Sequence, residues 1–159
     1  MRTLILFCLG CCLAGCAGEP AQQWPELDLT RYNIPLKIHA PDSAKVVAKN
    51  LSGIMQDVTI KSPADKFSLQ ILASQAPTND MARLKSEQLE LVRDNRYFSS
   101  IIREDPNGFV FQNRIDTTAY YGFRYIVYQG DQEYVFQNSF NATQSLAEIE
   151  AMYAAVKQK

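Results

Sequence analysis

Residues 97–140 read YFSSIIREDPNGFVFQNRIDTTAYYGFRYIVYQGDQEYVFQNSF. This stretch holds 12 of the 17 aromatic residues of the chain, and apolar and polar residues alternate along much of it. Alternation with a period of two predicts β-strands, and turn-forming residues interrupt it at three places. The sequence therefore predicts three consecutive hairpins, which form an antiparallel meander of four strands.

The turn at residues 105–108 sets the register of the first hairpin. Its sequence, Asp-Pro-Asn-Gly, has the residues favoured at the first, second and fourth positions of a type I turn. This turn places Glu104 opposite Phe109. Continued along the strands, the same register predicts two further pairs: Ile102 with Phe111, and Phe98 with Ile115.

The third hairpin turns at residues 130–131, Gly-Asp, which form a two-residue loop. This loop predicts three cross-strand pairs: Gln129 with Gln132, Val127 with Tyr134, and Tyr125 with Phe136. The aromatic side chains of the two strands then share one face of the sheet.

The middle hairpin is placed by its apolar residues. A three-residue loop at 118–120 puts Phe111 and Ile115 on the same face as Phe123 and Tyr125, whereas a one-residue slip would invert one strand. On the opposite face, this register puts Arg114 directly opposite Arg124, with Gln137 and Ser139 nearby. Half of that face is apolar, so we expect it to be covered as well.

The rest of the chain predicts further strands and a first helix. Alternating apolar residues predict strands over 34–38, 54–60 and 67–73, with a turn at 62–65. A helix follows over 79–94, capped by Thr78 or Asn79. One face of this helix is apolar and is formed by Met81, Leu84, Leu91 and Val92.

A second helix is predicted at the C-terminus, beginning at Thr143 or Ser145. Ser145 and Glu148 have the spacing of a capping box. Its apolar stripe is formed by Leu146, Ile149, Tyr153 and Val156. A sheet that is apolar on one face and half apolar on the other needs cover on both sides. The predicted fold class is α+β: a three-layer α/β/α sandwich around a mostly antiparallel sheet of about six or seven strands, with a C-terminal helix.

The order β-β-β-α, then an antiparallel meander and a terminal helix, resembles the Mog1/PsbP-like α/β/α sandwich family over about residues 32–157. The resemblance rests on element order and length, without a residue motif. It implies an accessory or binding protein rather than an enzyme with a shared active site. No functional residue is carried over from the family.

The N-terminus contains all the cysteines of the chain, Cys8, Cys11, Cys12 and Cys16. The apolar run over residues 4–14 is too short to span a membrane and is typical of a secretory signal. Residues 13–16, Leu-Ala-Gly-Cys, resemble the lipobox of bacterial lipoproteins. The resemblance implies cleavage before Cys16, a diacylglyceryl thioether on its sulfur and usually an acylated amine. The alternative is an ordinary signal peptide whose cleavage site contains a cysteine.

We therefore expect three parts: a lipoprotein signal peptide (1–15), a lipidated cysteine with a flexible tether (16–31) and a single α+β domain (32–159). By resemblance to the sorting rule of enterobacterial lipoproteins, Ala17 favours the outer membrane, on its periplasmic side. Trp24, the only tryptophan, is expected to rest either at the lipid interface or on the domain.

Charge and residue types narrow the classes of function. The chain has 16 Lys and Arg against 17 Asp and Glu, which argues against a nucleic-acid partner. His39, the only histidine, lacks a second His or a nearby Cys for zinc. Asp57 with Asp65, or Asp105 with Asp116, are pairs of carboxylates that folding could bring together. We predict no enzyme, metal or cofactor.

Two arginines opposed across a ladder repel each other unless a negative group bridges them. Two hypotheses for the negative group that bridges Arg114 and Arg124 remain. The bridging group is either an internal carboxylate (Asp116, Glu87 or Glu90) or a bound anion, with Gln137 and Ser139 as further donors. Tyr120 and Tyr128 are candidate contacts to a partner.

The predicted function is that of a membrane-tethered, non-enzymatic accessory or binding protein of the bacterial envelope. Its expected partners are the membrane, through the lipid anchor, and an envelope protein. The alternative is a small-anion or ligand-binding protein, or an enzyme, that uses the Arg114 and Arg124 site.

Overall fold

The structure is a computed structural model that describes residues 24–51, 53–139 and 143–158. In these residues the chain forms a seven-stranded sheet in the order β3-β4-β5-β9-β8-β7-β6, and every neighbouring pair is antiparallel. Its strands are β3 (Lys45–Leu51), β4 (Met55–Ser62), β5 (Phe67–Gln75), β6 (Phe98–Asp105), β7 (Gly108–Ile115), β8 (Thr118–Gln129) and β9 (Gln132–Asn138). The predicted α+β class is confirmed.

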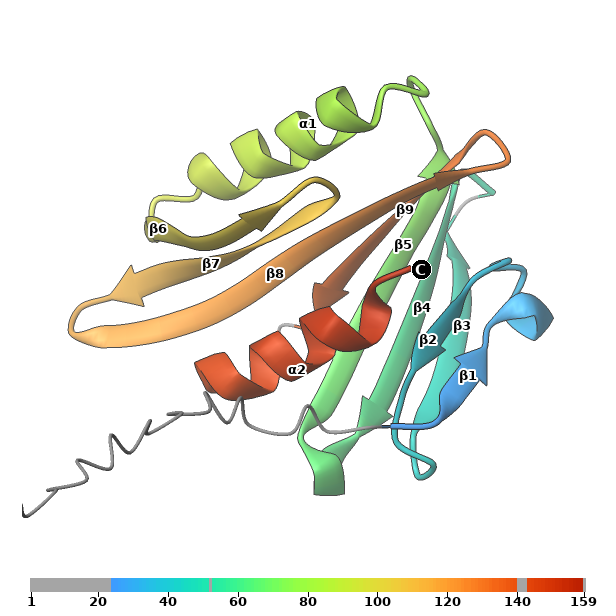
Figure 1. Cartoon of the computed structure of the whole chain (residues 1–159), viewed down its shortest axis with the longest axis horizontal. Coiled ribbons are helices and arrows are strands. Elements are labelled where there is room, and N and C mark those ends of the chain that lie inside the picture. Colours follow the sequence, from blue (N-terminus) through green and yellow to red (C-terminus); the bar gives the residue numbers. More distant parts are fainter. Residues whose placement is uncertain (1–23, 52, 140–142, 159) are drawn as a thin grey trace, which may run out of the picture.

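One face of the sheet, called the inner face here, is covered by a helix and a small hairpin. The helix is α2 (Leu146–Val156), and the hairpin consists of β1 (Glu26–Asp28) and β2 (Lys37–His39), joined through the 3-10 turn η1 (Thr30–Tyr32). Figure 1 shows both in front of the sheet. They enclose the main core, in which Tyr153 and Ile149 of α2 and Ile38 of β2 are fully buried.

The opposite face, called the outer face, carries α1 (Met81–Arg93) over the β6–β8 side. Leu89 and Val92 of this helix pack with Phe109 and Phe111 of β7 in a second core cluster. With α2 on the inner face, the expected helix on each side of the sheet is present. On the β3–β5 side of the outer face, no helix of the described chain covers the sheet (Figure 1).

The register of the middle hairpin differs from the prediction. β7 and β8 join through a two-residue turn, with Ile115 opposite Thr118 and Asp116 at φ 53°, instead of a loop at 118–120. Asp tolerates this left-handed conformation. Both faces of β7 are buried, with Phe109 and Phe111 on the outer face and Val110 on the inner face. An apolar pattern cannot select one register when both faces need cover, which is why the prediction failed.

The other two hairpins turn where the sequence indicates. Gln129 pairs with Gln132, Val127 with Tyr134 and Tyr125 with Phe136. Glu104 pairs with Phe109, but two register shifts in β6 place Ile101, and not Ile102, opposite Phe111, and Phe98 opposite Asn113. A bulge adds a residue to one strand only, so alternation alone does not reveal it.

The helices begin close to their predicted positions. Ser145 and Glu148 form the expected capping box of α2. The cap of α1 is Asp80, whose carboxylate accepts from the backbone N–H groups of Ala82 and Arg83, and not Thr78 or Asn79. Leu91, expected on the buried face of α1, is 66% exposed, and Leu89 takes its place.

The N-terminal boundary of the domain lies earlier than expected. Residues 24–31, which we assigned to the flexible tether, form β1 and part of η1, and Leu29 is fully buried. The Trp24 ring lies 4.9 Å from the Phe67 ring in an edge-to-face contact, so it rests on the domain. Cys16 and the rest of residues 1–23 lie outside the described residues.

Candidate functional site

The structure does not bring the two predicted arginines together. Arg114 lies opposite Ala119 and is exposed, whereas Arg124 lies opposite Phe109 on one side and Gln137 on the other. Because β7 and β8 are offset from the predicted register by an odd number of residues, the two side chains belong to opposite faces of the sheet. The predicted opposition of Arg114 and Arg124 is wrong.

Arg124 lies on the outer face in largely apolar surroundings. Its guanidinium is 5.9 Å from the centre of the Phe111 ring, and its Nη1 donates to the carbonyl of Phe123 at 3.2 Å. Burial lowers the pKa of Arg124 to about 10. Within the described residues, no carboxylate forms an ion pair with it. Neither Asp116, Glu87 nor Glu90 therefore bridges it.

A row of hydrogen-bonded amides continues from Arg124 across the outer face. Gln137 is 4% exposed, and its Nε2 donates to Oε1 of Gln70 at 2.6 Å. Gln70 in turn donates to Oδ2 of Asp57 at 2.9 Å. Ser139 is buried beside this row, and its N–H donates to the carbonyl of Ser68 at 2.9 Å. Gln137 and Ser139 thus serve the packing of the sheet.

The two candidate tyrosines do not form one surface. Tyr120 is half-buried opposite Asn113 inside β8, and does not lie in a loop as expected. Tyr128 lies near the other end of β8, where its hydroxyl donates to Oδ1 of Asp131 at 2.7 Å. Eight residues of strand separate them by about 27 Å.

A like-charge pair does exist on the outer face, but it is formed by lysines. Lys45 of β3 lies directly opposite Lys61 of β4, and Lys49 of β3 lies opposite Asp57. Alternation along β3 puts Lys45, Val47 and Lys49 on the same face as Arg124. We call Lys45, Val47, Lys49, Thr59 and Lys61 the lysine face.

The carboxylates nearest to the lysine face have other partners. Asp57 accepts from Gln70 and from the Thr59 hydroxyl. Asp65 accepts hydrogen bonds from the hydroxyls of Ser62 and Ser43. Both hydrogen bonds lower the pKa of Asp65, and the one from Ser62 has the larger effect. Among the described residues, the ion pairs of the protein do not include Lys45, Lys49 or Lys61. Of the two carboxylate pairs that folding could bring together, Asp105 and Asp116 lie apart, because they flank opposite ends of β7.

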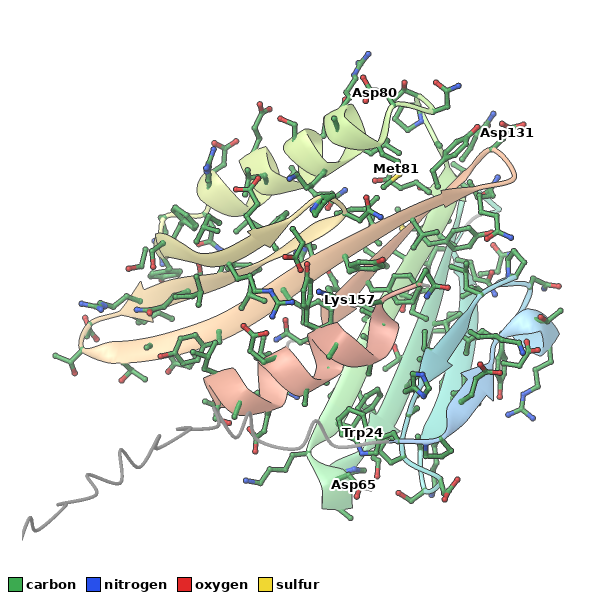
Figure 2. The ribbon with its side chains drawn as sticks, in the orientation of Figure 1. Trp24, Asp65, Asp80, Met81, Asp131 and Lys157 are labelled. Carbon is green, nitrogen blue, oxygen red and sulfur yellow. The ribbon has the colours of Figure 1, made fainter. Side chains whose placement is uncertain are left out.

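The lysine face is hollowed. A depression of about 420 Å³ is lined by the residues of the lysine face together with Ser43 and Pro63. Lys61 and Pro63 also line a second hollow of about 360 Å³, which Lys66 borders near η2 (Pro63–Asp65). Three lysines therefore line the first hollow, and a fourth, Lys66, borders the second, where it pairs with Glu148 at 3.0 Å. Trp24 lies at the same end of the molecule, near Asp65 (Figure 2).

The free edge of β3 borders this hollow. β3 is the first strand of the sheet, and its register with β4 runs unbroken from Lys45 to Leu51 (Figure 1). Such an edge presents unpaired backbone N–H and C=O groups. Exposed apolar residues lie on the same hairpin: Val47 is 53%, Leu51 44% and Ile54 79% exposed. At the other edge, the two bulges in β6 interrupt regular pairing.

Comparison with protein-family models, curated proteins and solved structures gives no match for this chain. In the described ranges, no cluster of three or more His, Cys, Asp or Glu has the geometry of a metal site. The helices of those ranges include none that is long and apolar enough to cross a bilayer.

Sequence reasoning missed the β3 strand and with it the lysine face. A signal is present in Lys45-Val46-Val47-Ala48-Lys49, where two β-branched residues stand between lysines that share a face. Residues 50–53, Asn-Leu-Ser-Gly, then mark the turn into β4. Because Val46 and Val47 point to opposite faces, the segment lacks the clean alternation that identified the other strands.

Proposed function

We propose that this protein is a lipid-anchored lipoprotein of the bacterial envelope, a non-enzymatic accessory module that binds an acidic, extended segment of an envelope protein along β3. The observation that carries the binding mode is the lysine face beside a regular free strand edge. The anchoring rests on the lipobox at residues 13–16. The kinship with the Mog1/PsbP-like family stays a prediction from element order.

The backbone of β3 supports binding of an extended segment. A strand added to an open sheet edge gains main-chain hydrogen bonds, and its alternate side chains give specificity. β3 offers this edge over seven residues. Val47 on the outer face supplies exposed apolar surface beside the lysines.

The charge of the lysine face selects the partner. Lys45 and Lys61 repel each other across the ladder, so an anion placed between them removes an unfavourable interaction. Asp or Glu at alternate positions of an added strand would reach both Lys45 and Lys49. Charge complementarity of this kind raises the association rate and excludes wrong partners.

The same lysines disfavour pairing of β3 with another copy of β3. Two lysine-bearing edges would repel, which is one of the ways in which proteins protect exposed edges from self-association. The proposed partner is therefore a different, acidic chain.

The proposed anchor keeps this site close to a membrane. Cys16 precedes Trp24 by eight residues, a segment that reaches at most about 28 Å when fully extended. Two or three acyl chains on Cys16 would hold the protein stably on the bilayer, whereas one chain would not. We place it at the outer membrane, facing the periplasm, on the basis of Ala17.

Anchoring is tested by metabolic labelling with palmitate in a bacterial host. The full chain should incorporate label and sediment with membranes, and Cys16→Ser should do neither. Incorporation of label into Cys16→Ser, or an unlabelled protein with intact Cys16, would contradict the anchor and leave the binding mode standing.

Partner binding is tested on the Cys16→Ser protein with two synthetic peptides. One alternates Glu with Val, and the other alternates Lys with Val. We expect the acidic peptide alone to bind, with an affinity that falls as salt is raised. Lys45→Gln and Lys61→Gln should weaken binding, and Arg114→Gln, which removes an exposed charge elsewhere, should not.

The alternative function, small-anion binding, predicts a different result in the same assay. Inorganic phosphate would then bind saturably and displace the acidic peptide, and peptide length would matter little. Equal binding of both peptides, or loss of binding in Arg114→Gln as well, would refute the lysine face as the site.

A further inference from the structure

A second cavity lies on the inner face of the sheet, on the other side of the β3–β4 hairpin from the lysine face. It has a volume of about 390 Å³. Its polar lining comes from three separate parts of the chain: Asn33 after η1, Asn50 and Gln56 of the β3–β4 hairpin, and Gln132 and Tyr134 of β9. We call it the amide pocket.

Tyr134 is the least exposed polar side chain of the amide pocket. It is 3% exposed as a whole, and no described residue hydrogen-bonds its hydroxyl, which stays accessible from the cavity. A tyrosine hydroxyl has a pKa of about 10 and is protonated at neutral pH, so it can donate; burial raises the pKa of Tyr134 further. The pocket therefore contains a prepared donor.

The amide side chains add further unused hydrogen-bonding groups. Nε2 of Gln56 donates to the carbonyl of Tyr32 at 2.6 Å, which fixes the side chain and leaves its Oε1 free to accept. The side chains of Asn33 and Gln132 make no hydrogen bonds to other described residues. Each carries both donors and an acceptor.

The charge of the residues that line the amide pocket limits the kinds of ligand that it can bind. No carboxylate is among the described residues that line the amide pocket, and Lys49 at its border is the only charged one. Amide and phenol groups match neutral groups that both donate and accept, such as hydroxyls. Ile54, Met55 and Ala48 supply an apolar side. A ligand with hydroxyls around its rim and an apolar C–H face fits this arrangement.

We propose that the amide pocket binds one neutral sugar ring, with Tyr134 and Gln132 as hydrogen-bonding partners of its hydroxyls. The volume is at the lower end of the range for small-molecule sites, which suits a single ring. This site lies on the opposite face of the sheet from the lysine face, with Lys49 bordering both, and the sugar ligand does not depend on the proposed protein partner.

The test is titration of the Cys16→Ser protein with methyl glucoside and with N-acetylglucosamine, followed by NMR. We expect saturable binding of at least one of them, with shifts centred on residues 132–134. Tyr134→Phe keeps the buried ring but removes the hydroxyl, and it should weaken binding about tenfold, as expected for one lost hydrogen bond. Tyr128→Phe on the outer face is the matched control and should bind like the parent protein.

Three outcomes would overturn the proposal. Neither sugar binds saturably; or Tyr134→Phe binds as tightly as the parent; or inorganic phosphate binds in the pocket more tightly than either sugar. A Gln132→Ala variant gives an independent check, because Gln132 is only half-buried and its loss should not disturb the core.

Discussion

The hydroxyl of Tyr153 donates a 3.0 Å hydrogen bond to Oδ2 of Asp105, which ties α2 to the β6–β7 turn. The same oxygen accepts from Arg103 at 3.0 Å and from Lys157 at 2.7 Å. Figure 2 shows Lys157 at the end of α2, over the middle of the sheet. These donors hold the pKa of Asp105 far below its usual range, and Arg103 has the largest effect. One carboxylate thus joins the C-terminal helix to the meander.

Acid should weaken this junction. Because the pKa of Asp105 is lowered in the folded state, its contribution is complete above the unfolded value of about 3.9 and is lost as the pH falls below it. Asp105→Asn should therefore reduce the free energy of unfolding at neutral pH by about 2 kcal/mol. The difference from the parent protein should shrink below about pH 4. Urea unfolding at a series of pH values measures the loss at neutral pH and its decrease in acid. Asp42→Asn, at an exposed carboxylate, is the control and should have the same free energy of unfolding as the parent protein at each pH.

Gly122 leaves room for the Phe111 ring on the outer face. A Cβ at residue 122 would come within 2.6 Å of this ring. Gly122→Ala should therefore lower the free energy of unfolding by about 1–3 kcal/mol through overpacking. Adding Phe111→Leu replaces the ring with a smaller side chain. The free energy of unfolding of the double variant should therefore fall by less than the sum of the losses in the two single variants. Strict additivity in thermal unfolding would contradict this contact.

Arg124 should contribute little to stability through its charge. It is largely buried and no described carboxylate pairs with it, so its desolvation is not compensated by an ion pair. Arg124→Met keeps the length of the side chain and should leave the free energy of unfolding unchanged or raise it by up to about 2 kcal/mol. A loss of more than about 1 kcal/mol in urea unfolding would contradict this account of Arg124.

The capping box of α2 should contribute as much to the free energy of unfolding as an ordinary helix cap. The Ser145 hydroxyl accepts from the N–H of Glu148 at 3.3 Å, and the Glu148 carboxylate accepts from the N–H of Ser145 at 2.8 Å. Ser145→Ala should lower the free energy of unfolding by about 1 kcal/mol. Ser86→Ala, at an exposed position inside α1, removes no cap and should leave the free energy of unfolding unchanged. Equal thermal shifts in the two variants would contradict the cap.

The sequence was most informative where a single local rule fixes the geometry. The turns at residues 105–108 and 130–131 and the Ser145 cap follow from residue chemistry within a few positions, and all three are confirmed. The β7–β8 register failed because both faces of β7 are buried, so burial gives no preference between registers. The bulges of β6 leave no mark in the alternation.

The candidate site was less predictable than the fold for the same physical reason. Like charges opposed across a ladder favour an anion between them, but the register decides which charges are opposed. In the predicted register the opposed pair is Arg114 and Arg124, whereas in the structure it is Lys45 and Lys61. Lys61 comes from a strand that the sequence predicts, whereas β3, which carries Lys45, was not predicted.

The most direct test of the central proposal is site-specific photocrosslinking at Val47 in the intact, anchored protein, with sequencing of the crosslinked peptide. A photoreactive residue at Ser86 on α1 serves as the matched control. The proposed function predicts one crosslinked partner at Val47, through a segment rich in Asp and Glu, that disappears in Lys45→Glu combined with Lys61→Glu and is absent from Ser86. The same products at Val47 and Ser86, or a partner segment without acidic residues that survives both charge reversals, would contradict it.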